Sequence, residues 1–108
     1  MRSRITLLLV VCSLFCLGMA CKHAVWPHTV TLTWQEPLPT PGISVVGYNV
    51  YRSTSASGPF VKIASRVAKS PYEDRLVGDG RTYFYTVTSI DQNGRESMFS
   101  AQTSVTIP

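Results

Sequence analysis

Apolar and polar residues alternate one by one in short segments from residue 29 onward, and this pattern constrains the fold more than any other feature of the sequence. In residues 29–34, Val30, Leu32 and Trp34 share one side, while three threonines occupy the other. Because successive side chains of a β-strand point to opposite faces of its sheet, this segment is expected to be a strand with one buried face. No stretch shows a convincing helical period. The alternation therefore predicts an all-β chain.

Further segments with strand character follow, separated by turns that contain proline or glycine. The clearest covers residues 82–90, where aromatic and β-branched side chains predominate. Residues 91–94 read Asp-Gln-Asn-Gly, and Asn-Gly favours a tight hairpin turn because it tolerates positive φ. Turns recur about every ten residues, which is typical of a two-sheet sandwich. The other predicted strands cover residues 43–52, residues 60–63, a brief segment around Tyr72 and part of residues 97–107.

Length and charge limit the classes of function. A chain of 108 residues fits one domain. The formal net charge of +4 includes Arg2 and Arg4, and without these two it falls to +2, with eight basic residues against six acidic ones. The remaining basic residues are scattered among acidic ones, whereas a nucleic-acid-binding domain gathers them on one face. We therefore expect no nucleic-acid partner.

The first twenty residues carry a targeting pattern. Arg2 and Arg4 form a basic start, residues 5–17 are an almost unbroken apolar run, and small residues follow at positions 18 and 20. Thirteen residues would span about 20 Å as a helix, which is short of a hydrocarbon core of roughly 30 Å. The pattern therefore predicts a signal peptide over residues 1–20 and not a transmembrane anchor.

Cys21 makes the leader more informative. Residues 17–21 read Leu-Gly-Met-Ala-Cys and resemble the bacterial lipoprotein cleavage box, in which the cysteine becomes the lipidated first residue. The other two cysteines, Cys12 and Cys16, fall within the leader, so Cys21 would be a lone thiol in an oxidising compartment. Lipidation would consume this thiol. Ordinary signal-peptide cleavage after Ala20, followed by secretion without a lipid, stays an alternative. Lys22 follows, and the absence of an aspartate there favours an outer membrane over inner-membrane retention.

Several segments resemble the fibronectin type III family. Residues 30–34, which end in Trp34, are similar to its second strand, and residues 47–52, Gly-Tyr-Asn-Val-Tyr-Arg, are similar to its third. The resemblance is strongest over the pattern formed by Tyr72, Glu73, Asp74, Val77, Gly80, Tyr83, Tyr85, Val87, Asp91, Gly94, Ser97 and Ser100.

This resemblance implies an antiparallel, immunoglobulin-like two-sheet sandwich over residues 28–108. Tyr83 would be the corner tyrosine whose hydroxyl bonds to the backbone near the preceding turn. Only residues 22–27 separate Cys21 from the second strand, so the first strand is expected to be short or missing, with residues 21–27 as a tether or short first strand. One sheet edge would then be thinly covered. The predicted core residues are Val30, Leu32, Trp34, Tyr48, Val50, Tyr83, Tyr85 and Val87.

Few groups could carry chemistry. His23 and His28 are the only histidines, and without a cysteine or carboxylate cluster they are expected at surface or linker positions. Glu73 and Asp74 are adjacent, so in a strand they would point to opposite faces and could not act as a carboxylate pair. We therefore predict that the chain is not an enzyme and uses no cofactor or metal ion.

Two functional hypotheses follow. The first is a non-enzymatic extracytoplasmic module for binding, adhesion or spacing, anchored through Cys21, with an unknown protein or glycan as partner. The alternative is a carbohydrate-associated accessory protein that binds polysaccharide through exposed aromatic residues. Trp26 and Tyr51 are the candidate contact residues. Trp26 lies close to Cys21, where it either caps the core or lies at a membrane interface or binding surface.

Overall fold

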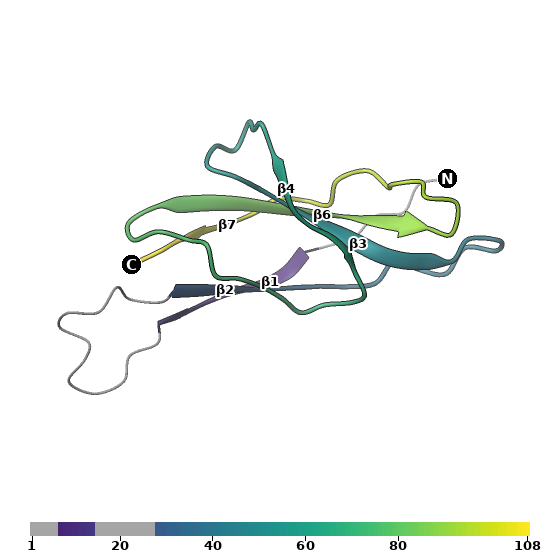
Figure 1. The fold of residues 1–108 in the computed structure, drawn as a ribbon, viewed down its shortest axis with the longest axis horizontal. Coiled ribbons are helices and arrows are strands. Elements are labelled where there is room, and N and C mark those ends of the chain that lie inside the picture. Colours follow the sequence, from purple (N-terminus) through teal and green to yellow (C-terminus); the bar gives the residue numbers. More distant parts are fainter. Residues whose placement is uncertain (1–6, 15–27) are drawn as a thin grey trace.

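The computed structural model describes residues 7–14 and 28–108, and all regular elements within these ranges are β-strands (Figure 1). No helix in the described ranges is long and apolar enough to cross a membrane. The strands are β1 (Leu7–Leu14), β2 (His28–Trp34), β3 (Val45–Ser53), β4 (Val61–Val67), β5 (Tyr72–Asp74), β6 (Thr82–Asp91) and β7 (Thr103–Thr106).

The strands form two antiparallel sheets. One has the order β1-β2-β5 and the other the order β4-β3-β6-β7. Figure 1 shows the four-stranded sheet as one layer, with β1 and β2 in the layer opposite it. The predicted all-β, immunoglobulin-like two-sheet sandwich is thereby confirmed.

The core lies between the sheets and is built from the inward faces of β2, β3 and β6. Trp34 at the end of β2 packs against Tyr48 of β3, with 5.4 Å between the ring centroids. Because these strands belong to different sheets, this contact closes the sandwich. All eight residues expected in the core are buried, and Ile107 joins them: Val30, Leu32, Trp34, Tyr48, Val50, Tyr83, Tyr85, Val87 and Ile107.

The turn before β6 is fixed by a tyrosine hydroxyl. The backbone N–H of Gly78 donates to the Tyr83 hydroxyl over 2.8 Å. Gly80 adopts a φ of 71°, a conformation that glycine reaches without steric cost, and its N–H donates to the carbonyl of Ile107. Tyr83 therefore occupies the corner position that the family resemblance implies.

β1 covers the outer edge of β2. It pairs with β2 along the whole strand, from Leu7 opposite Trp34 to Leu14 opposite His28. β1 lies within residues 1–20, the range predicted to be a signal peptide, so in the intact chain the edge expected to be thinly covered is paired. Residues 21–27, predicted as a tether or short first strand, lie outside the described residues, as do the candidate positions Cys21, His23 and Trp26.

A buried polar cluster connects the two sheets at one end. Asp74 of β5 accepts a hydrogen bond from the Tyr85 hydroxyl (2.6 Å) and pairs with Arg52 over 2.8 Å. Arg52 also lies 5.2 Å from the centre of the Tyr83 ring. Burial, followed by the hydrogen bond to Asp74, raises the pKa of Tyr85, so its hydroxyl stays protonated as a donor. Each group has a partner on another strand, so the cluster stabilises the contact between the two sheets.

His28 departs from its expected place. It was predicted at a surface or linker position, but it is the first residue of β2 and only 4% exposed, and its Nε2 lies 2.8 Å from Asp79. The strand begins one residue earlier than the alternation indicated, which places His28 on the same inward face as Val30. The surface assignment was therefore wrong.

Candidate functional site

The outward face of the four-stranded sheet brings polar side chains from three segments together. Alternation along β3 turns Tyr48 and Val50 inward and Asn49 and Tyr51 outward. The antiparallel register places Thr88 of β6 opposite Asn49. The chain then turns after β6 and brings Glu96 back beside that strand.

Glu96 is the centre of this arrangement. Its Oε2 accepts hydrogen bonds from Asn49 Nδ2 (3.0 Å) and from Thr88 Oγ1 (2.6 Å), and the Tyr51 hydroxyl also donates to it. The other amide atom of Asn49, Oδ1, accepts from the backbone N–H of Arg66 in β4. The carboxylate therefore fixes side chains of two strands, and Asn49 extends the network to a third.

The hydrogen bonds determine the charge of Glu96. Partial burial by itself would raise the pKa of the carboxyl, but hydrogen bonds from Thr88, Tyr51 and Asn49, together with the nearby Lys62 ammonium, hold this pKa below its ordinary value. Burial, and then the hydrogen bond to Glu96, raises the pKa of the Tyr51 hydroxyl. At neutral pH the site thus contains an ionised carboxylate and a protonated phenol.

An aromatic cluster adjoins this polar network. The ring centroids of Tyr51 and Phe99 are 4.9 Å apart, and the two rings are tilted by 58°. The ring of Phe60 also contacts Phe99, with 5.9 Å between the centroids. The Lys62 ammonium lies 5.9 Å from the centre of the Tyr51 ring. Phe99 is 53% exposed, and the neighbouring side chains of Met98 and Val61 are exposed as well. Exposed apolar and aromatic side chains that gather on a surface are typical of a contact region.

A shallow polar hollow completes the site. It has a volume of about 290 Å³, and its lining includes Asn49, Lys62, Arg66 and Glu96. The hollow therefore shares the side chains of Asn49 and Glu96 with the network, and Lys62, which also lies near the Tyr51 ring, connects it to the aromatic cluster. We call the combined region the outer-face site and define it by Asn49, Tyr51, Phe60, Lys62, Thr88, Glu96 and Phe99.

Sequence reasoning found one member of this site. Tyr51 was predicted as a surface contact residue, and the structure places it at the meeting point of the network and the aromatic cluster. Phe60, Glu96 and Phe99 were missed because they lie outside the regular strands, where alternation does not indicate which way a side chain points. Two apolar residues, Met98 and Phe99, in a segment otherwise rich in polar residues were the signal that could have found them.

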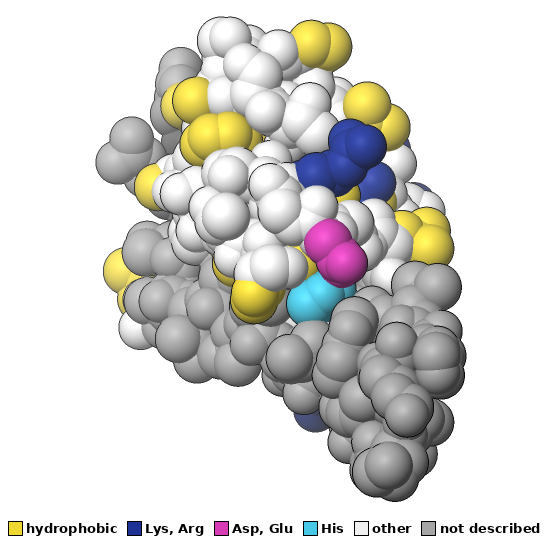
Figure 2. Space-filling view, turned by 90° about the vertical axis from the view of Figure 1, so that its left-hand side faces the viewer, with side chains coloured by type: hydrophobic (Ala, Val, Ile, Leu, Met, Phe, Trp, Pro, Cys, Tyr) yellow, Lys and Arg dark blue, Asp and Glu magenta, His cyan; other side chains and the backbone are white. Residues whose placement is uncertain are grey.

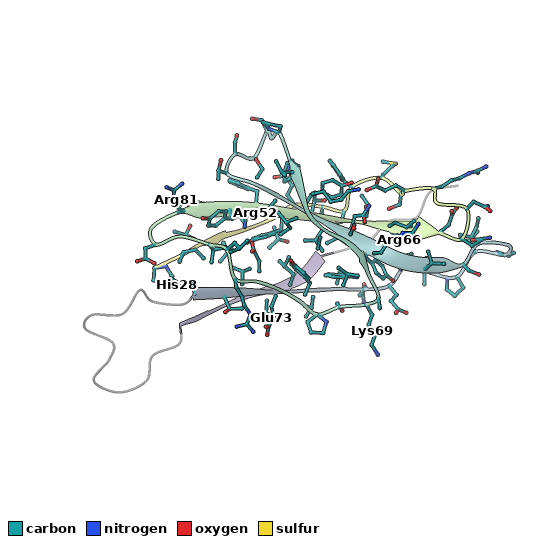
Figure 3. The ribbon with its side chains drawn as sticks, viewed as in Figure 1. His28, Arg52, Arg66, Lys69, Glu73 and Arg81 are labelled. Carbon is teal, nitrogen blue, oxygen red and sulfur yellow. The ribbon has the colours of Figure 1, made fainter. Side chains whose placement is uncertain are left out.

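Charge on the described surface is dispersed. Figure 2 looks onto the end of the molecule that carries His28, where a small group of basic side chains lies near an acidic side chain and the histidine. The described residues contain no group of three or more histidine, cysteine or acidic side chains placed to hold a metal ion. Figure 3 shows that basic side chains are spread along the sandwich, as seen for Arg81, Arg52, Arg66 and Lys69.

Known structures share this two-sheet architecture. No family model matches the sequence. The solved structure of an Fn3-like protein from Clostridium thermocellum is 36% identical, covers 74% of this chain and 77% of that one, and superposes with a TM-score of 0.63. The chain belongs to the fibronectin type III family. The sixth fibronectin type III domain of human fibronectin type III domain containing protein 3 shares the fold at 17% identity, with a TM-score of 0.63 over 99% of this chain and 85% of that domain.

Two curated relatives carry a similar segment inside much larger enzymes. The amylopullulanase of Thermoanaerobacterium saccharolyticum is 36% identical over 74 residues, which is 68% of this chain. The amylopullulanase of Thermoanaerobacterium thermosulfurigenes is 41% identical over 71 residues, or 66% of this chain. The matched segments span only 5% and 4% of those enzymes. The similarity is therefore to a small fibronectin type III segment, a non-catalytic type of domain.

Proposed function

We propose that this protein is a non-catalytic contact module that works outside the cytoplasm and is attached to a membrane through a lipid on Cys21. Residues 1–20 supply the basic start, apolar run and small residues of a signal peptide, and Cys21 stands at the position that lipidation requires. Acyl chains contribute about 0.8 kcal/mol for each buried methylene, so two or more of them hold a domain of this size on a membrane.

The outer-face site is the observation that carries the contact function. The Phe99 ring is exposed and those of Tyr51 and Phe60 are half-buried, while the side chains around Glu96 are already fixed by hydrogen bonds. A partner that binds there would order few additional side chains, and this reduces the entropic cost of association. Asn49, Tyr51 and Thr88 lie on strands, which hold their side chains more rigidly than a loop does.

A polysaccharide is the partner class that two observations favour. The relatives are amylopullulanases, and this name refers to amylose and pullulan, polymers too large to cross a membrane unaided. The outer-face site combines aromatic surface with a small number of placed polar groups, as sites for small polar molecules do. Glu96 and Lys62 could respectively accept from and donate to sugar hydroxyls. Phe99 offers the largest exposed ring area beside them.

Retention by polysaccharides tests this function. We expect the processed protein, kept in detergent, to migrate more slowly through native gels that contain starch or pullulan than through plain gels. Phe99→Ser should abolish the retardation without unfolding the domain, because this side chain is already largely in solvent. Leu76→Ser provides a matched control, since Leu76 is exposed but lies outside the outer-face site. The polysaccharide assignment is wrong if no gel retards the protein, or if Phe99→Ser is retarded equally.

A further inference from the structure

We infer that the outer edge of β2, once the leader has been removed, pairs with β2 of a second copy and forms a two-fold symmetric dimer. This inference rests on the proposed removal of residues 1–20, because those residues contain β1. It concerns the opposite sheet from the outer-face site and does not depend on the identity of any ligand.

The pairing of β2 in the intact chain shows what this edge accepts. β1 lies antiparallel to β2 over the whole strand, whereas on its other side β2 meets β5 only from Val30 to Leu32. Removal of the leader would therefore take away the strand that pairs with one complete side of the seven-residue β2. Such an edge is a template for pairing with another chain.

The other sheet edges carry features that oppose pairing. β4 presents Lys62 and Arg66, its register with β3 shifts twice, and Arg66 adopts a φ of 53°. β5 has only three residues and carries Glu73, and β7 has only four residues. Charges, bulges and short length are the means by which edge strands avoid association. Pairing with another chain is therefore favoured at an edge strand that lacks these features.

β2 has none of these features. It is seven residues long and contains no lysine, arginine, carboxylate, proline or glycine. Its one titratable side chain, His28, faces inward and is paired with Asp79. Among the described strands, β2 is thus the edge with the fewest features that oppose pairing once β1 is gone.

The sequence of β2 is complementary to itself in the antiparallel orientation. If Thr31 faces Thr31 of the second copy, then Val30 faces Leu32, and Thr29 faces Thr33, in each direction. Apolar residues therefore meet on the inner face and threonines meet on the outer face, and both kinds of cross-strand pair stabilise sheets. The same residues contribute from both copies, which is the property of a two-fold interface. This match favours a second copy over an unrelated extended peptide.

Attachment to a membrane would assist the association. Two copies held by lipids on one surface meet at a higher effective concentration than two copies free in solution. Pairing through β2 would join the two sheets that have lost β1 into one sheet with the order β5-β2-β2-β5. Each outer-face site would remain free, because it lies on the other sheet.

Cross-linking through a single engineered thiol tests the dimer. In an antiparallel pair centred on Thr31, the two Cα atoms at this position would be about 4.5–5.5 Å apart, a separation that a disulfide can bridge. The thiol of lipidated Cys21 is blocked, so Thr31→Cys would supply the one reactive thiol of the processed protein. Ser104→Cys on the exposed face of β7 is the matched control. Both variants are oxidised mildly in membranes and compared on non-reducing gels.

We expect a band of twice the monomer mass that is several-fold stronger for Thr31→Cys than for Ser104→Cys. Monomer alone for Thr31→Cys, or a cross-link to a different protein, would overturn the inference. Mass spectrometry of the same samples reports whether residues 1–20 have been removed. A retained leader would overturn the proposed function and this inference with it, whereas a processed monomer would overturn the dimer alone.

Discussion

Trp34 shows how a single side chain holds this sandwich together. It is 4% exposed, stands at the end of β2, and contacts the ring of Tyr48 from the facing sheet. A tryptophan side chain buries more area than any other, and a tilted ring contact adds to that burial. The free energy of the fold therefore depends strongly on this residue.

Trp34→Ala is expected to lower the free energy of unfolding by about 3–5 kcal/mol, because it loses buried apolar area and leaves a cavity. That loss is a large part of the roughly 5–15 kcal/mol by which a typical domain is stable. Thermal unfolding followed by circular dichroism measures it. Leu38→Ala, at an exposed position in the proline-rich loop, should change stability by less than about 0.5 kcal/mol. An unaltered melting curve for Trp34→Ala would mean that the core lies elsewhere.

At the residue scale, the alternation in the sequence predicts buried apolar side chains better than buried polar ones. Val30 and Val87 lie at inward positions that the period of two identifies directly. Asp74 also faces inward, and it is tolerated there because Arg52 and Tyr85 reach it from the other sheet. Such a partnership depends on how the two sheets face each other, and no local pattern contains that information.

Among the elements, the turn after β6 has the clearest consequence for the surface. Gly94 adopts the positive φ that Asn-Gly predicts, and its N–H donates to the carbonyl of Asp91. The Asp91 carboxylate accepts two further backbone N–H groups within the turn. The chain is thereby reversed, and Glu96 lies beside Thr88. The turn could be predicted from the sequence, but the site that it completes could not.

The Glu96 network should make stability depend on pH. The folded-state pKa of Glu96 is lowered, so the unfolded chain binds its proton more readily than the folded chain does. The resulting stabilisation is fully present above the ordinary glutamate pKa of about 4.3, and it is lost as the pH falls through the lowered folded-state value.

Glu96→Gln removes this contribution, because an amide carries no charge to titrate. In urea unfolding, the variant should be less stable than the parent at neutral pH, and the difference should shrink as the pH is lowered to about 3. Glu73→Gln is the control, since Glu73 is an exposed residue on the other sheet. A difference between Glu96→Gln and the parent that stays constant with pH would contradict the network described for this carboxylate.

The lengths of two strands illustrate how tertiary contacts override local pattern. β4 extends to Val67, beyond the predicted residues 60–63, because β3 provides hydrogen-bonding partners along that whole edge. β7 begins only at Thr103, since Ser97 and Ser100 use their hydroxyls to accept backbone N–H groups of β6 where a regular ladder would otherwise form.

For the whole molecule, pattern and family resemblance together were sufficient for the fold, while the role of the first residues depends on processing. The apolar run of residues 5–17 shows no alternation, so its composition indicates a leader, yet part of it forms β1 beside β2 in the intact chain. Both statements are compatible if the strand is present before processing and absent afterwards. The outer-face site lies on the other sheet, to which β1 does not belong.

The mass of the N-terminal peptide of the processed protein tests the central claim most directly. We expect a peptide that begins at Cys21 and carries acyl chains on this residue. An N-terminal peptide with a free Cys21 thiol, or one that still includes residues 1–20, would contradict a module held outside the cytoplasm by a lipid.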